Sequence, residues 1–174
     1  APADPRAMDD VERAAAAIRA GDLVVYPTET VYGLGADALA PAAIERVFAA
    51  KRRDRDTPLS MAVPTVEAAL EYTAPGERAV AFMEAVLPGP VTVVVERGPA
   101  VPDALTGGRD RVGVRVPDHE MALALLERVA PITATSANVS GAPSTRSVAD
   151  LDPAIGDAAA VVVDGGETPG GGST

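Results

Sequence analysis

The stretch LVVYPTETVYGLG, from Leu23 to Gly35, joins a short apolar run to a loop rich in polar side chains. The run Leu23 to Tyr26 ends at Pro27 and predicts a buried strand, because short apolar segments bounded by turn signals are typical of a sheet interior. The loop after it carries two threonines and Glu29 beside glycines, which let a backbone approach a ligand closely. This combination predicts a strand that delivers a ligand-binding loop.

Helix and strand signals alternate along the rest of the chain. Helices are expected at residues 9–19, 41–50, 66–72, 76–86 and 120–129, with a short one at 150–155. Strands are expected at residues 23–26, 60–63, 91–96, 112–116, 132–135 and 160–164. Asp9 is expected to cap the first helix and Gly21 to end it. The alternation predicts a layered α/β domain with a mostly buried, mixed sheet, on which ligands bind where strands end in loops.

Length and composition favour one domain over residues 1–174. The chain is 47% hydrophobic and shows no internal repeat, so it can bury a substantial core as one unit. Its net charge of −10 argues against general affinity for nucleic acid or an anionic membrane. No apolar run is long enough to span a bilayer, and the absence of cysteine excludes disulfides and thiolate chemistry. We therefore expect a cytoplasmic enzyme or binding protein without a membrane partner.

Lys51 is the only lysine in a chain with fourteen arginines. It lies in Lys51-Arg52-Arg53, after a predicted helix and before the segment TPL at residues 57–59. An ammonium is a compact point charge and a guanidinium is a planar fork, so the two grip an oxyanion differently. Lys51 is therefore either an oxyanion-binding residue or a lysine that survives by chance at the end of a solvated helix.

Two further segments place polar groups at the ends of predicted strands. Residues 135–141 offer small, uncharged hydrogen-bonding side chains, which fit either a binding loop or a closed turn. Arg115 lies in an apolar strand before Pro117, so its side chain either faces solvent or enters a pocket to hold a carboxylate or phosphate. The glycine-rich end after Gly165 resembles a phosphate-binding loop in composition and equally a flexible terminus.

Several other chemistries find no support in the sequence. His119 is the only histidine and precedes a predicted helix, so we expect it near the helix start. One histidine without cysteine argues against a zinc site, and no Ser-His-Asp spacing is compelling. Neither GxxxxGK[ST] nor GxGxxG follows a strand, which argues against ordinary P-loop and Rossmann nucleotide sites.

Six segments occur in the order seen in one protein family. They are YPTETVYGLGADA (26–38), KRR followed by TPL (51–59), LPGPVT (87–92), VGVRVPDH (112–119), SANVSG (136–141) and the closing GGGST (170–174). With these segments the chain resembles the YrdC/Sua5/TsaC family over nearly its whole length. The resemblance implies a single YrdC-like domain with a three-layer α/β (α+β) fold. In that fold a twisted, mixed β-sheet carries a deep concave site.

The resemblance also implies an enzyme, a nucleotidyltransferase of the L-threonylcarbamoyladenylate synthase type. Such an enzyme condenses L-threonine, bicarbonate and ATP to threonylcarbamoyl-AMP and pyrophosphate. A tRNA threonylcarbamoyl transferase complex then uses this product to form threonylcarbamoyladenosine in tRNA. Mg²⁺ is expected to bridge the ATP phosphates, with ligands from substrate oxygens and water, because no dedicated carboxylate cage is evident.

The same resemblance assigns roles to individual residues. A Lys-x-Arg pair and a Ser-x-Asn pair of the family correspond to the expected catalytic residues Lys51, Arg53, Ser136 and Asn138. The expected ATP-binding residues are Lys51, Arg53, Thr57, Arg111, Asn138 and Arg146. The expected threonine-binding residues are Thr30, Arg115, Ser136 and Ser173. No residue is expected to bind a metal directly, and for Glu29 a role in holding its loop is favoured over a contact with a metal-bound water.

The chain departs from the family pattern at three places. Ala62 stands where some relatives have a histidine near threonine, and Arg146 replaces a small hydroxyl residue. The sequence ends at Thr174, where relatives continue into another strand, so the expectation is either a truncated C-terminal end or a disordered end that the sequence omits. Two other functions stay open: a carbamoyl-adenylate-forming module of the YrdC type, and a nonenzymatic double-stranded RNA-binding protein that makes weak RNA contact through a local basic patch.

Overall fold

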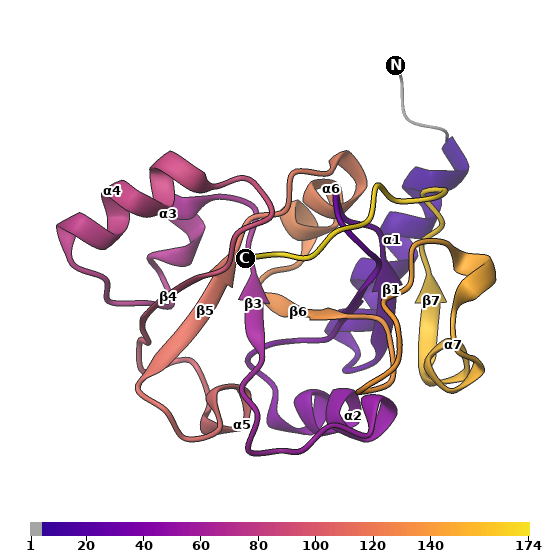
Figure 1. Cartoon of the computed structure of the whole chain (residues 1–174), viewed down its shortest axis with the longest axis horizontal. Helices are drawn as coiled ribbons and strands as arrows, with labels where there is room; N and C mark the ends of the chain where they lie inside the picture. The colour runs from indigo at the N-terminus through magenta and orange to yellow at the C-terminus, as the bar shows by residue number, and fades with distance from the viewer. Residues whose placement is uncertain (1–4) are drawn as a thin grey trace.

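The computed structural model describes residues 5–174, which form an α/β fold (Figure 1). The helices are α1 (Pro5–Arg19), α2 (Pro41–Lys51), α3 (Val66–Ala69), α4 (Glu77–Val86), α5 (Asp103–Thr106), α6 (Glu120–Arg128), the 3-10 helix η1 (Val148–Asp150) and α7 (Pro153–Ala158). The strands are β1 (Leu23–Tyr26), β2 (Gly33–Gly35), β3 (Ser60–Ala62), β4 (Val93–Glu96), β5 (Arg111–Arg115), β6 (Ile132–Ser136) and β7 (Ala159–Val162). None of the helices in this described part is long and apolar enough to cross a membrane.

The strands form one seven-stranded mixed sheet in the order β4-β5-β3-β6-β2-β1-β7. β1 is parallel to β7 and β3 is parallel to β5, whereas the other neighbouring pairs are antiparallel. β6 joins the two halves of the sheet, because it pairs with β2 through Ser136 and Gly33 and with β3 through Ala134 and Ser60. The predicted α/β class with a mixed sheet is confirmed.

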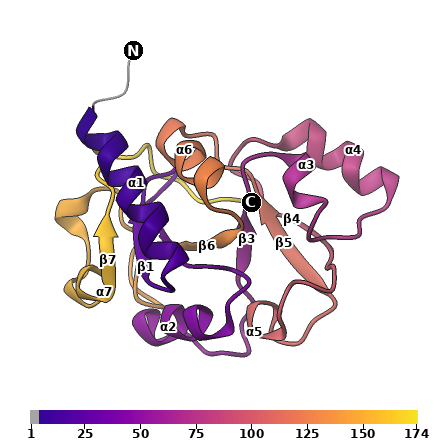
Figure 2. The same ribbon diagram turned by 180° about the vertical axis from the view of Figure 1, so that it is seen from behind.

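Hydrophobic side chains occupy both faces of the sheet. On one face α1 and α6 pack side by side (Figure 2), in the same cluster as Val24 and Tyr26 of β1. On the other face α2 and α5 join a cluster with Leu23 and Val25. Successive residues of β1 therefore face opposite cores, which explains why a continuous apolar run was needed here. Figure 1 shows α3 and α4 at the opposite end of the molecule from β7 and α7.

Helix boundaries differ from the prediction by more than one residue at three places, of which one is α3, which ends at Ala69 where residue 72 was expected. The prediction that Asp9 caps the first helix is wrong, because α1 spans Pro5–Arg19 and Asp9 lies inside it. The predicted helix 150–155 is divided, since η1 ends at Asp150 and α7 starts after the capping side chain of Asp152. Gly21 follows α1 with a φ of +89°, as its predicted role requires. His119 caps α6 by accepting the Met121 N–H at Nδ1, at 3.2 Å.

Strand β2 exists because Gly33 and Gly35 carry no side chain. A Cβ atom on Gly33 would lie 2.9 Å from Cζ of Tyr26, and one on Gly35 would lie 3.0 Å from its Cε1 atom. The Tyr26 ring is fully packed beneath them, and its hydroxyl donates to the Thr133 carbonyl at 3.1 Å. Burial raises the pKa of Tyr26 to about 12, so the phenol stays neutral and donating. These glycines allow close packing against the Tyr26 ring, whereas the sequence predicted a loop in which they approach a ligand.

Candidate functional site

A cavity of about 330 Å³ lies where the loop after β1 meets β3, β5, β6 and the C-terminal segment. Among the residues that line it are Thr30, Arg53, Ser60, Arg115, Ser136 and Ser173. Two arginines and several hydroxyl groups face the cavity, whereas no aspartate or glutamate does, as far as the described residues reach. The site is therefore a local cationic pocket in a chain of net charge −10, and it suits an anionic ligand.

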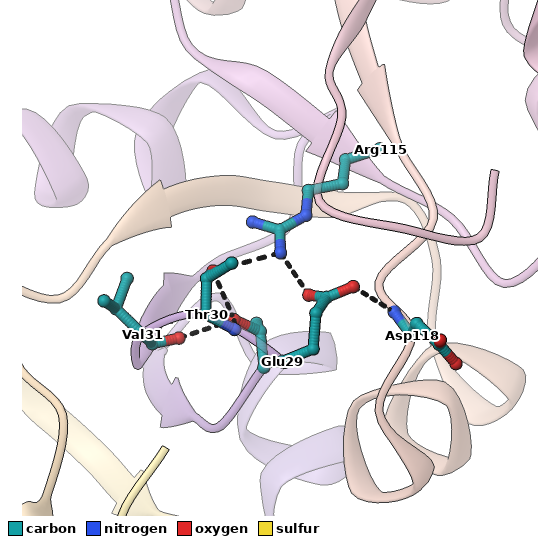
Figure 3. A network of polar contacts seen from close by, with 6 residues as sticks. Glu29, Thr30, Val31, Arg115 and Asp118 are labelled. Atoms are coloured by element: carbon teal, nitrogen blue, oxygen red, sulfur yellow. Dashed lines mark hydrogen bonds and ion pairs between the residues drawn. The ribbon is translucent and has the colours of Figure 1, made fainter. Parts of the chain in front are cut away.

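Thr28 and Thr30 form a hydrogen-bond chain whose direction is fixed. The Thr28 hydroxyl donates to the Val31 carbonyl at 2.6 Å, because a carbonyl oxygen only accepts. In its contact with the Thr30 hydroxyl, at 3.1 Å, Thr30 must then be the donor. Arg115 Nη2 donates to Thr30 Oγ1 at 3.2 Å (Figure 3). With its proton used and one lone pair engaged, Thr30 Oγ1 keeps one accepting position for a ligand.

Arg115 enters the cavity wall from β5, and an acidic partner lies behind it. Its Nη2 atom forms an ion pair with Oε1 of Glu29, while Glu29 Oε2 accepts the Asp118 N–H at 2.6 Å (Figure 3). The Arg115 side chain is only 11% exposed. Its Nε atom is buried without a hydrogen-bond partner among the described residues. Of the two orientations open for Arg115, the structure shows the one that faces the pocket, and the Glu29 carboxylate contacts Arg115 and the loop after β5.

The backbone turn at Arg52 separates the directions of Lys51 and Arg53. Arg52 has φ 52° and ψ 41°, a left-handed conformation that a residue with a side chain seldom adopts. This conformation ends α2, and the N–H of Arg53 bonds back to the Phe48 carbonyl at 3.0 Å. Lys51 lies in the core on the buried face of α2, whereas Arg53, beyond the turn, reaches the cavity.

The Lys51 ammonium lies beneath the turn that follows β6. Nζ donates to the carbonyl oxygens of Ser136 and Asn138, the latter at 2.9 Å, and the Lys51 carbonyl accepts the Ser140 N–H at 2.8 Å. Burial, and then the charge of Arg53, lower the pKa of Lys51 to about 8. The structure thus brings the Lys-x-Arg and Ser-x-Asn pairs together. Lys51 itself is 2% exposed and is not among the described residues that line the cavity.

Arg53 and Asn138 each keep one buried polar atom without a partner among the described residues. Asn138 Nδ2 donates to the carbonyls of Val139 and Ala142, at 3.1 and 3.0 Å, which leaves Oδ1 unused. Arg53 Nη2 donates to the Pro58 carbonyl at 2.9 Å and Nε is unused. Because buried polar atoms are usually hydrogen-bonded, the unused atom of Arg53, which lines the cavity, is a candidate for a ligand contact. Asn138 lies outside the cavity lining, and its side chain bonds within the loop that follows Ser136.

The C-terminal strap, residues 165–174, completes the cavity wall. Figure 1 shows it leaving β7 and ending beside β3. The Gly170 N–H donates to the Thr30 carbonyl at 2.7 Å, and Thr174 exchanges hydrogen bonds with Pro90 and Thr92 at 2.9 and 2.8 Å. Between these two anchors Gly171, Gly172 and Ser173 line the cavity. The glycine-rich end is therefore part of the site, and Ser173 lies where a ligand would meet it.

Arg146 contacts the strap and does not line the cavity. Its Nε and Nη2 atoms donate to the Thr168 carbonyl at 3.2 and 3.0 Å, and Nη2 lies 3.3 Å from the Glu167 carboxylate. Thr57 is exposed and also lies outside the cavity lining. Arg111 lines a neighbouring hollow of about 440 Å³, which shares Pro58, Leu59 and Ser60 with the cavity. These three residues, all predicted to bind ATP, are thus not brought together in the cavity.

Sequence reasoning assigned no site role to several polar residues of the wall, among them Tyr32, Ser60, Thr92 and Ser144. Ser60 and Thr92 crowd the position of Gly113 in β5, where a Cβ atom would lie 2.8 Å from Thr92 Cγ2. A glycine inside a strand often marks a close approach of another chain segment or a ligand, and this signal was present in VGVRV. In the described part of the chain, no three His, Cys, Asp or Glu side chains gather into a possible metal site.

Comparison with known proteins places these features in context. Residues 16–174 match the Sua5/YciO/YrdC family model, which is described as telomere recombination. A threonylcarbamoyl-AMP synthase of Pyrococcus abyssi is 45% identical over 158 residues, which are 89% of this chain and 46% of that protein. A putative threonylcarbamoyl-AMP synthase of Mycobacterium tuberculosis is 38% identical over 168 residues, which are 94% of this chain and 76% of that protein.

A solved structure of a relative has the same fold as this chain. The crystal structure of P. abyssi Sua5 complexed with L-threonine has a TM-score of 0.88 to this chain at 41% sequence identity. That match covers 96% of this chain and 50% of the P. abyssi chain. The chain therefore spans about half the length of its P. abyssi relatives.

Proposed function

The chain belongs to the Sua5/YciO/YrdC family, and from this premise we propose that it condenses L-threonine, bicarbonate and ATP to threonylcarbamoyl-AMP and pyrophosphate. The observation that carries the proposal is the cavity lined by Arg53, Arg115 and hydroxyl groups without a facing carboxylate. All three substrates carry carboxylate, bicarbonate or phosphate oxygens. A cationic pocket that offers hydrogen bonds but no competing negative charge suits such a set.

We assign the threonine subsite to Arg115, Thr30, Ser136 and Ser173, which all line the cavity. The Nη1 group of Arg115 has no partner among the described residues, and a guanidinium charge suits a carboxylate, so Arg115 is the natural partner of the threonine carboxylate. Thr30 Oγ1 retains only an accepting position, and it therefore receives a hydrogen from the substrate. The L-threonine complex of the P. abyssi relative supports this choice of substrate.

We assign the phosphates of ATP to Arg53 and to the loop that Lys51 and Asn138 hold. Arg53 faces the cavity and has an unused Nε atom. Lys51 fixes the carbonyls of Ser136 and Asn138 from below and adds a nearby positive charge. Phosphoryl transfer depends mainly on such positioning and on charge placed against the phosphate oxygens. Thr57, Arg111 and Arg146 stay predicted nucleotide contacts, of which Arg111 lies in the adjoining hollow.

The proposed reaction begins when the threonine amine attacks bicarbonate to give N-carboxythreonine, with loss of water. The new carboxylate then attacks the α-phosphate in line, and pyrophosphate leaves with the electrons of the broken P–O bond. Gathering three small reactants in one cavity supplies a large part of the acceleration. The described side chains do not fit a protein-held metal, so we derive no step from Mg²⁺, which commonly binds to nucleotide phosphates and water. Transfer of the product to tRNA would need a partner transferase.

The test is threonine-dependent release of pyrophosphate with ATP and bicarbonate in excess. L-Valine has nearly the shape of L-threonine but leaves the accepting position of Thr30 and neighbouring hydroxyls unpaired, which costs about 1–3 kcal/mol for each buried group. We expect valine to react at least about tenfold more slowly than threonine, with serine as a weak substrate. Omitting bicarbonate is the control. Equal rates with threonine and valine would contradict the proposed threonine subsite.

A further inference from the structure

We propose that Glu29 is a positioning residue for substrate recognition: it fixes the Arg115 guanidinium so that the remaining N–H groups of Arg115 meet the carboxylate of the amino acid. This inference rests on the proposed function and deepens it. Glu29 acts through Arg115 and makes no contact with the substrate itself. Neither the family motif nor the position of Glu29 in the sequence assigns it this role.

Glu29 lies behind the cavity wall. Arg115 and Thr30 line the cavity, whereas Glu29 does not, and its side chain is 17% exposed. Figure 3 shows the Glu29 carboxylate directed at one terminal nitrogen of Arg115, with the other terminal nitrogen pointing away from it. Glu29 and Thr30 both use Nη2, and Nε is buried in the wall, so the hydrogens of Nη1 are left for a ligand.

The Glu29 carboxylate holds the Arg115 side chain in place when no substrate is bound. Arginine has a long, flexible side chain, and because the Arg115 side chain is mostly buried, its charge needs an acidic partner to stay in place. Glu29 supplies that partner without occupying the cavity. The guanidinium is consequently ordered before the substrate arrives, which lowers the ordering cost of binding.

Glu29 also joins two loops that are distant in sequence. Its Oε2 atom accepts the Asp118 N–H at 2.6 Å, in the loop that follows β5, while its backbone lies inside the turn closed by Thr28 and Val31. Pro117 of the loop after β5 lines the cavity. The two oxygens of one carboxylate therefore fix both the direction of Arg115 and the loop that continues from it.

The charge of Glu29 also has an effect on threonine binding that opposes the effect of positioning. A negative charge on Glu29 partly neutralises Arg115 and so weakens its attraction for a second carboxylate. If this charge effect were dominant, removal of the Glu29 charge would strengthen threonine binding. Positioning predicts weaker binding, so the direction of the change distinguishes the two effects.

The decisive variant is Glu29→Gln, which keeps the size of the side chain. Its amide nitrogen is a donor, and it would face either Arg115 Nη2 or the Asp118 N–H, which are donors too, so one of the two contacts is lost. Calorimetry would measure the dissociation constants of L-threonine, of L-threoninol, which lacks the carboxylate, and of ATP. We expect threonine to bind at least about tenfold more weakly, while threoninol and ATP change less than about twofold.

Two further variants act as controls. Glu12→Gln removes an ion pair of the same kind, between Glu12 on α1 and Arg128 on α6, and should leave all three affinities unchanged. Glu29→Gln introduced on an Arg115→Ala background should have little further effect on threonine binding, because the two residues act as one unit. If Glu29→Gln does not fold, Glu29→Asp keeps the charge, retracts it by one methylene group and should weaken threonine binding selectively.

The outcomes separate this inference from the proposed function. Unchanged or stronger threonine binding in a folded Glu29→Gln protein would overturn the positioning role, even when the wild-type protein binds threonine. An equal loss for threonine and threoninol would also overturn it, since a carboxylate-specific effect is required. A wild-type protein that does not bind threonine would overturn the proposed function, and this inference with it.

Discussion

Replacing Lys51 by methionine removes the ammonium and keeps an unbranched side chain. The Ser136 and Asn138 carbonyls then lose their charged donor, at about 1–3 kcal/mol for each buried carbonyl left unpaired. An opposing gain follows because the folded protein no longer holds a buried charge. A pKa lowered from 10.5 to about 8 corresponds to about 3 kcal/mol below pH 8. The two effects nearly offset, so we expect a free energy of unfolding that changes by less than about 3 kcal/mol.

Turnover should respond much more strongly than stability. Without the ammonium, the loop that carries Ser136 loses its support and the phosphates lose a nearby positive charge. We expect at least a tenfold lower turnover for Lys51→Met and Lys51→Ala, equivalent to about 1.4 kcal/mol of transition-state stabilisation. Lys51→Arg should also be clearly impaired, because a planar fork cannot bond two converging carbonyls as a compact ammonium does. The assays are pyrophosphate release at saturating ATP and thermal unfolding.

Proton linkage predicts in which direction the free energy of unfolding changes with pH. Unfolded Lys51 keeps its proton up to a pKa of 10.5, while the folded residue loses it at about 8. The unfolded state therefore binds more protons between these values, and the free energy of unfolding of the wild type should rise with pH there relative to Lys51→Met. Turnover of Lys51→Met within about twofold of wild type, or no difference in this pH range, would refute the reasoning.

Three other expectations concern the rest of the site. Arg115→Ala should weaken threonine binding far more than ATP binding in calorimetry, and a loss confined to ATP would reassign Arg115 to the nucleotide. ATP affinity should fall as the pH rises through about 8, because Lys51 loses its charge, and the fall should be absent in Lys51→Met. Arg146→Ala should free the C-terminal strap, which glutamyl endopeptidase would then cleave faster after Glu167; Arg13→Ala, which loses only an exposed ion pair with Asp10, is its control.

Much of the fold was predictable because β1, α2 and α6 carry strong apolar patterns. β2 was missed since its glycines suggest a loop until Tyr26 is placed against them. The short helix α5 was missed too: it has only four residues, too few for a periodic pattern, although Gly107 ends it in the left-handed conformation that glycine favours.

The site was predictable in part, through motifs that mark Arg53, Arg115, Ser136 and Ser173. The burial of Lys51 was missed although it has a local signal, because Lys51 follows Val47 by four residues and Phe48 by three, on the apolar face of α2. The ion pair of Glu29 with Arg115 joins residues 86 positions apart and depends on the packing of β5 against the loop after β1. Contacts of this kind follow from tertiary structure and leave no local signal.

The one-way hydrogen-bond chain from Arg115 through Thr30 and Thr28 to the Val31 carbonyl has a consequence for inhibitor design. Its far end is a carbonyl that cannot donate, so the chain cannot reverse to suit a different ligand. A compound that presents an ether or a carbonyl oxygen to Thr30 meets an acceptor with an acceptor and is repelled. Compounds directed at this pocket should therefore pair an anionic group for Arg115 with a hydroxyl or amine hydrogen for Thr30.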